Sequence, residues 1–396
     1  MRSKKYFNEK DGLTYSQEVI RKYEDPAYAA EADRYEREQR RHGGRHEDPN
    51  GRKRRRKKKG GAGRVIRRVL LVILILLILM IAYIFKITSN LDKVDTSNAD
   101  FAISTEASVD LLKYRNIAIL GSDARKGESY DGSRTDAIII FSINRVTDKV
   151  RLISIMRDSY LKIADGNGNL MLDKITHAHH YGGGVDTCAS LNRSLDLNIK
   201  EYVIFNWKAV ADAVDTLGGI TINVRKNEIH DLNQYGKETA ENVGGTYHRI
   251  THSGEQTLDG TQAATYCRIR KTSGGDTGRA RRYKTVLNAT LKKAATSPWK
   301  LGALSEKVMP EIRTNMSQYQ LMTLIFRAPG YDIEKNISWP KSYYGGIVHS
   351  LWYAVPTTLN SNVRWLHRKA FDDETYTPSQ TVRSINDEII QDTGLQ

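Results

Sequence analysis

The stretch that decides the fold is NIAILGSDARKGESYDGSRTDAIIIFSIN, residues 116–144. Its two ends, NIAIL and AIIIFSIN, are apolar β-branched runs of the kind that form buried strands. The segment between them is strongly charged. In an open α/β sheet, ligands gather at the loops beyond strand ends. The stretch therefore predicts two core strands with a polar site at their ends.

Further runs of the same kind follow along the chain, and amphipathic segments separate them. VRLISI (150–155), YVIFN (202–206) and ITINV (220–224) are predicted strands, and helical periodicity is present near 186–197, 207–217, 258–270, 277–296 and 316–328. Strands that alternate with helices imply a sheet covered on both faces. We predict an α/β domain with a mixed central β-sheet flanked by helices, an α/β/α sandwich.

An uninterrupted apolar run of 17 residues, VLLVILILLILMIAYIF, occupies residues 69–85. It is long enough for a short transmembrane helix, and it lies too far from the N-terminus for a cleaved signal peptide. The preceding segment 52–68 holds 11 cationic residues in 17, which marks the cytoplasmic side and suits anionic lipid headgroups. We predict a single-pass protein of the cell membrane with a cytoplasmic N-terminus and an extracellular C-terminal domain.

The charge of the chain is concentrated in its N-terminal part. Residues 1–68 carry 22 Lys/Arg and 11 Asp/Glu, so most of the net charge of +15 lies there and the main domain is nearly balanced. That distribution argues against nucleic acid as a partner. The predicted segments are a disordered basic arm (1–64), a transmembrane helix with its basic flank (65–87), a juxtamembrane stalk (88–112), a catalytic domain (113–368) and a loose polar tail (369–396).

Asp123 follows the first strand and Asp136 begins the second. If these strand ends are adjacent, both carboxylates face one crevice, and paired carboxylates suit Mg²⁺. The alternative is local: Asp123 caps a turn and Arg134 pairs with Asp136 at the surface. A second charged pair, Arg157 and Asp158, follows the strand 150–155, where a surface ion pair is again the alternative. The middle of the loop, ARKGESYDG (124–132), is predicted to be flexible.

A cluster of arginines in YCRIRKTSGGDTGRARRYKTV (266–286) changes the balance between these interpretations. Arg268 and Arg270 leave a predicted helix, and Arg279 lies in the first turn of the next, where the helix dipole disfavours a cation unless an anion is bound. Arginine grips phosphate bidentately, so the cluster is typical of a diphosphate clamp. The alternative is a set of surface arginines paired with Asp276 and solvent.

Two other sets of residues, a group of histidines and the cysteines, could bind a metal or form a disulfide. THAHHYGGG (176–184) brings three histidines together, but it lacks the remaining ligands and the carboxylate–His motif of a zinc site, and we predict an outward-facing loop. The sequence holds two cysteines, Cys188 and Cys267, and leaves their pairing open. P-loop, nucleophile-elbow and dinucleotide motifs are absent from the sequence.

The ordered set of motifs resembles the LytR–CpsA–Psr family of cell-wall ligases. The resemblance covers residues 113–296 and rests on NIAILGSDAR, SRTDAIIIFSIN, LISIMRDSYLKI, KITHAHHYGGG, YVIFNWKAVADAVDTLGGITINV and GEQTLDGTQAATYCRIRKTSGGDTGRARR. It implies a phosphotransferase that moves a glycopolymer from a polyprenyl diphosphate carrier to peptidoglycan at the outer membrane surface. It also implies Mg²⁺, or Mn²⁺ in its place, as cofactor.

Matched residue by residue, the resemblance assigns Asp123 and Asp136 to the metal and makes Asp123 a candidate base. It assigns a catalytic role to Asp123, Asp136 and Arg157. The implied diphosphate-binding residues are Arg134, Arg157, Arg268, Arg270, Arg279 and Arg282.

The chain departs from the family pattern at three positions, with Met156 for Pro, Thr176 for Asn and Tyr283 for Gln.

Two other functions are consistent with the same sequence. One is a membrane-anchored transcriptional regulator or attenuator whose basic arm acts inside the cell. The other is a polyprenyl-diphosphate pyrophosphatase, which would use the same site with water as the acceptor. Neither the polymer nor the acceptor sugar can be identified from the sequence.

Overall fold

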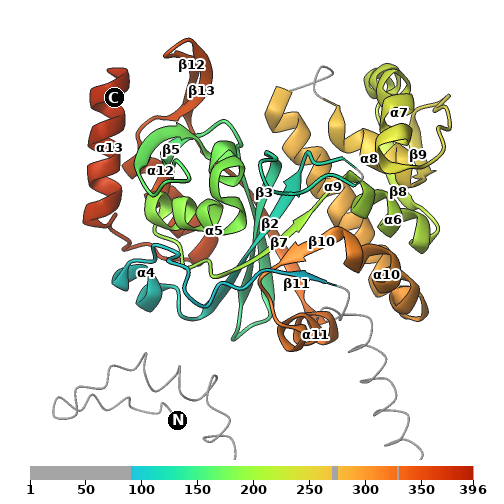
Figure 1. Cartoon of the computed structure of the whole chain (residues 1–396), viewed down its shortest axis with the longest axis horizontal. Coiled ribbons are helices and arrows are strands. Elements are labelled where there is room, and N and C mark those ends of the chain that lie inside the picture. Colours follow the sequence, from blue (N-terminus) through green and yellow to red (C-terminus); the bar gives the residue numbers. More distant parts are fainter. Residues whose placement is uncertain (1–90, 126, 270–274, 328–329, 396) are drawn as a thin grey trace, which may run out of the picture. The chain divides into compact units, whose positions relative to one another are not determined.

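The structure is a computed structural model that describes residues 91–395, except residues 126, 270–274 and 328–329 (Figure 1). The predicted basic arm (1–64), the predicted transmembrane helix (65–87) and the first residues of the predicted stalk therefore lie outside the described part. Within the described part, no helix is both long and apolar enough to cross a membrane.

A mixed seven-stranded sheet forms the centre of the described residues, in the order β1-β10-β7-β2-β3-β4-β11. Its middle is the antiparallel pair β2–β3, and β7 and β11 add parallel neighbours on either side. The strands are β1 (Asp92–Lys93), β2 (Tyr114–Ser122), β3 (Thr135–Asn144), β4 (Lys149–Ile155), β7 (Glu201–Phe205), β10 (Ile312–Thr314) and β11 (Asp332–Trp339). The mixed central sheet predicted from the sequence is confirmed.

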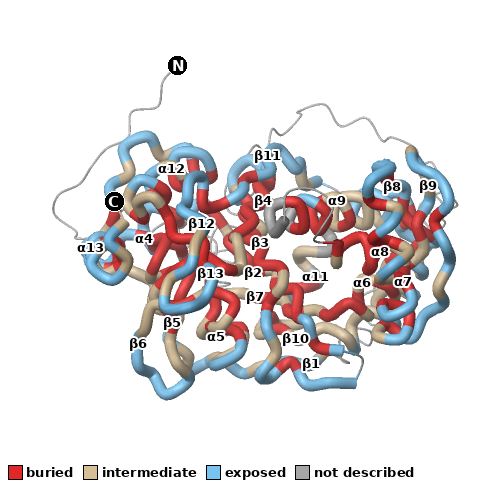
Figure 2. The backbone as a smooth tube through the Cα atoms, turned by 90° about the horizontal axis from the view of Figure 1, so that it is seen from above, coloured by how far each residue is buried: buried red, intermediate tan, exposed pale blue. Residues whose placement is uncertain are grey.

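The apolar runs are continuous because both faces of the sheet are covered. Successive side chains of a strand point to opposite faces. On β2, Ala118 and Leu120 join one buried cluster while Ile117 joins the other, and on β3 Ile138 and Ile139 divide in the same way. Figure 2 shows the buried backbone concentrated in the sheet and in the helix faces turned toward it.

One face of the sheet is covered by helices from the middle and the end of the chain, together with two short hairpins (Figure 1). These elements are α4 (Thr105–Asp110), α5 (Ile175–Leu195), α12 (Leu359–Phe371), α13 (Gln380–Thr393), the hairpin β5 (Tyr160–Ala164) with β6 (Leu170–Lys174), and the hairpin β12 (Tyr343–Val348) with β13 (Leu351–Pro356). Helix α5 is kinked at Gly182 and Gly183. A Cβ on the next residue, Gly184, would lie 2.5 Å from the Tyr202 ring, so only glycine fits there.

The other face is covered by a largely helical layer and one hairpin. The elements are α6 (Trp207–Leu217), α7 (Ile229–Val243), α8 (Gly260–Arg268), α9 (Gly275–Ala295), α10 (Leu301–Val308), α11 (Gln318–Arg327) and the hairpin β8 (Ile220–Val224) with β9 (Gly254–Leu258). Three short 3₁₀ turns connect them: η1 (Lys226–Glu228), η2 (Pro298–Lys300) and η3 (Met309–Glu311).

Three expectations differ from the structure. ITINV forms β8, but it pairs with β9 outside the central sheet. The predicted tail 369–396 contains α13, whose Val382, Ile385 and Ile389 are buried in the core, so it is not a loose polar segment. The described part of the predicted stalk packs on the domain, because β1 pairs with β10 and Leu111 is buried.

The two cysteines are unpaired, which settles what the sequence left open. Cys188 belongs to the buried cluster on one face of the sheet and Cys267 to the cluster on the other. Burial raises the pKa of both thiols, which leaves them protonated and unreactive.

Candidate active site

The charged loop between β2 and β3 is closed at its base by paired polar contacts. The Asp123 backbone N–H donates to the Arg134 carbonyl at 3.0 Å, and the Arg134 backbone N–H donates to Asp123 Oδ1 at 2.8 Å. The Ser122 and Ser133 hydroxyls lie 2.7 Å apart and form a further hydrogen bond. These contacts fix the Asp123 carboxylate at the end of β2 while its side chain stays exposed.

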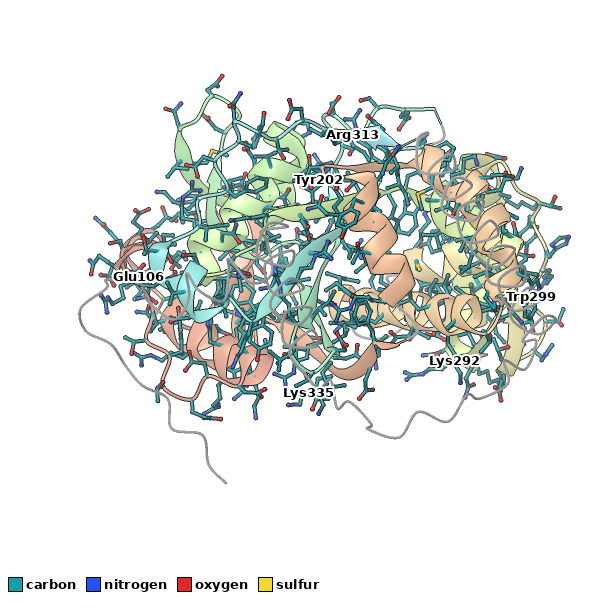
Figure 3. All side chains as sticks on the ribbon, turned by 90° about the horizontal axis from the view of Figure 1, so that it is seen from below. Glu106, Tyr202, Lys292, Trp299, Arg313 and Lys335 are labelled. Atoms are coloured by element: carbon teal, nitrogen blue, oxygen red, sulfur yellow. The ribbon has the colours of Figure 1, made fainter. Side chains whose placement is uncertain are left out.

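The end of the segment 124–132 is anchored through Tyr130 and Asp131, while the flexibility predicted for the segment as a whole stays a prediction. Tyr130 is buried and its hydroxyl donates to the Glu311 carbonyl at 2.6 Å. Arg313 lies on β10, next to the edge strand β1, and contacts both Asp92 and Asp131 at 2.5 Å (Figure 3). The loop therefore spans from the ends of the central strands to the sheet edge with fixed contacts at both places.

The histidines of THAHHYGGG lie in the first turns of α5 rather than in an outward loop. His179 Nδ1 donates to the Ser133 carbonyl at 3.0 Å, and His180 Nδ1 donates to the Gly132 carbonyl, so both hold the charged loop. Burial lowers the pKa of His179, which keeps its ring neutral. Among the described residues, no group of three His, Cys, Asp or Glu side chains is arranged to hold a metal ion.

Asp136 and Arg157 meet because β3 and β4 are antiparallel neighbours. The last register pair, Ile138 with Ile155, places residues 136 and 157 opposite each other just beyond it. Arg157 Nη1 donates to Asp136 Oδ1, and Arg157 Nε donates to Asp158 Oδ2 at 3.2 Å. The sequence predicted an ion pair between Arg157 and Asp158, which is present, but the pairing of Arg157 with Asp136 was not predicted.

Two further cations complete this cluster. Arg279, only 2% exposed, brings Nη1 to 3.4 Å from Asp136 Oδ2. Lys174 Nζ lies 3.0 Å from Asp158 Oδ1. Burial by itself would raise the pKa of Asp158, but the Arg157 guanidinium and the Lys174 ammonium together hold that pKa below its ordinary value. Asp158 is therefore an anion that orients Arg157.

Arg268 reaches the site from the end of α8. Its Nη1 donates to Thr239 Oγ1 at 2.8 Å and its Nη2 donates to Glu238 Oε1 at 2.7 Å, so α7 holds the guanidinium. The hydrogen bond and charge of Arg268 lower the pKa of Glu238.

The structure does not bring Arg134 and Arg282 to the same place. Arg282 is buried in an ion pair with Glu228, with Nε 2.9 Å from Oε1, and lines neither of the two cavities described below. Arg134 is exposed and also lines neither cavity. Arg270 lies outside the described residues.

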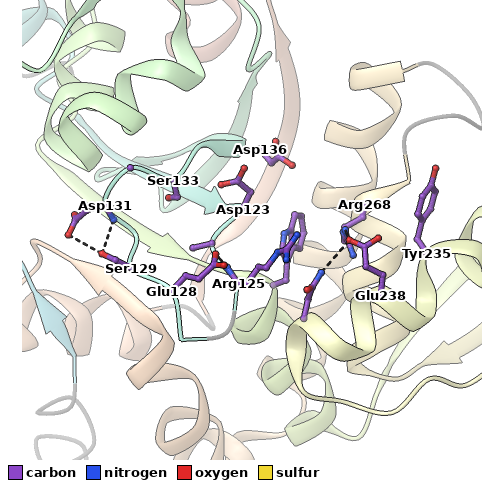
Figure 4. Close-up of a pocket in the computed structure, with 14 residues that line it drawn as sticks. Asp123, Arg125, Glu128, Ser129, Asp131, Ser133, Asp136, Tyr235, Glu238 and Arg268 are labelled. Carbon is purple, nitrogen blue, oxygen red and sulfur yellow. Dashed lines mark hydrogen bonds and ion pairs between the residues drawn. The ribbon is translucent and has the colours of Figure 1, made fainter.

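Two cavities of opposite character meet at Asp136. A polar cavity of about 970 Å³ is lined by Asp123, Asp136, Arg268 and residues of the charged loop and α7 (Figure 4). A cavity of about 270 Å³ lies on the other side and has a mostly apolar wall. That wall includes Ile139, Ile155, Met156, Tyr283, Trp339 and Trp365, while Arg157 and Arg279 stand at its polar end.

Several contributors to the site were missed in the sequence. Tyr283 stacks on Trp207 at a centroid distance of 5.5 Å, so the residue that departs from the family pattern forms part of the wall. Its neighbour Lys284 lines neither cavity: it is buried, donates to the Ile337 carbonyl at 2.9 Å, and has its pKa lowered to about 8 by burial. The side chains of α7 that line the polar cavity belong to no sequence motif. In the sequence they could have been recognised only by the helical spacing of polar residues.

The comparisons with known proteins agree with this arrangement. A model of the LytR_cpsA_psr family matches residues 54–357. TagU of Oceanobacillus iheyensis, named a polyisoprenyl-teichoic acid–peptidoglycan teichoic acid transferase, is 32% identical over 250 residues, covering 61% of this chain and 70% of that protein.

Two solved structures share the fold. Protein gbs0355 from Streptococcus agalactiae matches with a TM-score of 0.57 at 20% identity, over 70% of this chain and 95% of that one. TagT bound to LIIa-WTA matches with a TM-score of 0.50 at 23% identity, over 72% and 93%. At these identities both structures speak for the fold alone. Since the family model spans well over half of the sequence and the match to TagU agrees with it, the chain belongs to the LytR_cpsA_psr family.

Proposed function

We propose that this protein is a membrane-anchored phosphotransferase that moves a glycopolymer from a polyprenyl diphosphate carrier to peptidoglycan. The observation that carries the proposal is the position of Asp136, with Arg157 and Arg279, between a polar cavity of about 970 Å³ and an apolar one of about 270 Å³. An amphipathic substrate fits this arrangement: the diphosphate lies at the arginines, the first part of the prenyl chain in the apolar cavity and the glycan in the polar one. The name of the TagU relative supports the same substrate class.

The reaction is a displacement at the phosphorus that carries the glycan. The acceptor hydroxyl oxygen forms a bond to this phosphorus, the bond from phosphorus to the bridging oxygen breaks, and polyprenyl phosphate leaves. Negative charge grows on the leaving oxygen, and phosphoryl transfer is catalysed mainly by positioning and by fixed positive charge. Arg157 and Arg279 are held in place for this task by Asp136, and Arg268 is held by α7.

Asp123 and Asp136 are the residues that would hold Mg²⁺. Both carboxylates line the polar cavity, and only one Asp123 oxygen accepts a hydrogen bond from the described residues. Hard oxygen ligands of this kind fit Mg²⁺, which is usually held by one or two carboxylates together with substrate phosphates and water. When bound, the ion would neutralise charge on the phosphate oxygens.

The location follows from the predicted segments outside the described residues. The apolar run 69–85 and the basic flank 52–68 support a position of the domain on the outer surface of the cell membrane, next to a lipid-linked substrate. A tether of this kind raises the local concentration of such a substrate.

The test is a transfer assay with the full chain in vesicles, a synthetic lipid-diphosphate-linked disaccharide, Mg²⁺ and uncrosslinked peptidoglycan. The proposal expects disaccharide phosphate on the wall material and polyprenyl phosphate in equal amount. Release of free disaccharide phosphate, with none on peptidoglycan, would instead identify a pyrophosphatase. If the lipid is not converted at all, neither to product on peptidoglycan nor to free disaccharide phosphate, both enzymatic functions are contradicted.

A further inference from the structure

One face of α7 forms a wall of the polar cavity. Tyr235, Glu238 and Asn242 are spaced three and four residues apart, which places them on the same side of the helix. All three line the cavity, whereas Leu232 and Val243 on the adjacent stripe of the helix are buried in the core. An aromatic ring, an amide and a carboxylate on one wall are a combination that suits the ring faces and hydroxyls of a sugar.

Glu238 lies next to the guanidinium that is predicted to hold the diphosphate. Arg268 Nη2 donates to Glu238 Oε1 at 2.7 Å, and Arg268 itself lines the cavity. A guanidinium presents five donors in a rigid fork, so it can hold a phosphate oxygen while it still contacts Glu238. The phosphate and the carboxylate would then be separated by the width of one guanidinium. Figure 4 shows Glu238 and Arg268 side by side, across the cavity from Asp123.

The other carboxylates that line this cavity also have partners, as Glu238 has in Arg268, but they belong to the charged loop or to the proposed metal site. Asp136 contacts two guanidiniums, and Asp123 accepts from a backbone N–H and is the proposed metal ligand. Glu128 Oε2 accepts from a backbone N–H of its own loop at 2.7 Å, and Asp131 is paired with an arginine of β10. The side chain of Glu238 is 51% exposed, so an incoming hydroxyl can reach it.

We propose that the α7 wall is the acceptor subsite and that Glu238 is the general base of the transfer. Its carboxylate takes the proton of the attacking sugar hydroxyl while that oxygen bonds to phosphorus and polyprenyl phosphate departs. Tyr235 and Asn242 position the acceptor sugar. This role rests on the proposed function, because it assigns a residue to the acceptor side of the same reaction.

The electrostatics change in the required direction when substrate binds. In the structure, Arg268 lowers the pKa of Glu238, which makes the carboxylate a weak base. An anionic diphosphate that shares the guanidinium offsets this positive charge. The basicity of Glu238 therefore rises when the donor is in place, and the base is strengthened only in the complex that can react.

The test compares E238Q with T239V in the full chain. T239V removes one of the two contacts that hold Arg268 and E238Q weakens the other by removing its charge, but only E238Q removes the carboxylate. Transfer of the synthetic lipid-linked disaccharide to peptidoglycan is measured from pH 4 to 8, together with the KM for the lipid. The carboxylate is retained but displaced in E238D, which serves as the conservative variant.

We expect E238Q to lower kcat by about 10²–10³-fold and to abolish the acidic limb of the pH profile, with the lipid KM within about threefold of the wild type. T239V and E238D are expected to keep that limb. If E238Q keeps the limb, or if T239V loses it equally, Glu238 only holds Arg268 and the proposed role is overturned. If the wild-type chain shows no transfer activity, the proposed function itself is refuted. If the wild type is active, the results for E238Q bear only on the role of Glu238.

Discussion

The buried pair of Arg282 and Glu228 makes a prediction that separates a structural arginine from a substrate-binding one. Both side chains are 3% exposed, and Arg282 Nη1 also donates to the Ile269 carbonyl at 3.0 Å. Glu228 Oε2 accepts from the Arg225 backbone N–H at 3.0 Å, which leaves Oε1 dependent on Arg282. We expect R282M to destabilise the domain.

The magnitude follows from what the substitution leaves behind. Removing one partner of a buried ion pair strands the other charge and typically costs about 3–5 kcal/mol. The Ile269 carbonyl also loses a donor, which places R282M toward the upper end of that range. Domains of this kind have about 5–15 kcal/mol of stability in total. A loss of about 4 kcal/mol corresponds to a decrease of roughly 10 °C in the melting temperature.

The measurement is the free energy of unfolding by urea for the wild type, R282M, E228Q and the double variant. Because the double variant leaves no stranded charge, it should be more stable than R282M by about 2 kcal/mol or more. At a temperature where R282M is folded, its KM for the lipid should be close to that of the wild type. A stable R282M with a greatly raised KM would refute this reasoning and return Arg282 to the diphosphate site.

Four further outcomes are expected. R157Q should lower kcat/KM for the lipid by about 10²–10³-fold in the transfer assay, because it removes a positioned donor; a loss below threefold would count against the site. M156W should narrow the apolar cavity and raise the KM about tenfold for a long-chain lipid but not for a short-chain analogue, as measured in paired titrations. Chelation by EDTA should reduce transfer at least tenfold, with Mg²⁺ restoring it, and D123N should require more Mg²⁺ than the wild type for half-maximal activity. Lys284 has a pKa of about 8 in the folded chain and a higher one when unfolded, so the unfolded state binds more protons between pH 8 and 10.5; the stability of the wild type relative to K284M should therefore rise with pH across that window by up to about 3 kcal/mol and stay constant below pH 8, as measured by urea unfolding.

The central strands could be predicted because their signal is local. Continuous β-branched runs imply strands buried on both faces, and β2, β3 and β4 satisfy this. ITINV alternates apolar and polar residues, and β8 is correspondingly buried on one face only, in a hairpin. Whether a strand joins the main sheet depends on distant pairing, which the alternation alone does not encode.

The C-terminal helix shows a local signal that composition concealed. Val382, Ile385 and Ile389 recur at spacings of three and four residues, which is the period of an amphipathic helix. The segment as a whole is polar, so its composition suggested a loose tail. Its apolar stripe is nevertheless wide enough to pack against the core.

In the candidate site, too, some residues could be predicted from the local sequence, whereas the positions of others depend on contacts with distant residues. Asp136 lies at the start of β3 and Arg157 just after β4, and antiparallel pairing of these consecutive strands brings them together. Arg279 and Arg282 lie one helical turn apart in a single motif, and yet only Arg279 lines a cavity. Arg282 faces Glu228, a partner more than fifty residues away that has no motif of its own.

The charges around Asp136 explain why the proposed reaction would call for an added cation. The carboxylates of Asp123, Asp136 and Asp158 are balanced by Arg157, Arg279 and Lys174. Arg268 is likewise balanced by Glu238, so these described groups together carry no net charge. A diphosphate diester brings two negative charges into this neutral cluster, and burying them without compensation is costly. One divalent ion at Asp123 and Asp136 would restore neutrality, so in the proposed reaction the arginines would supply geometry and the metal the missing charge.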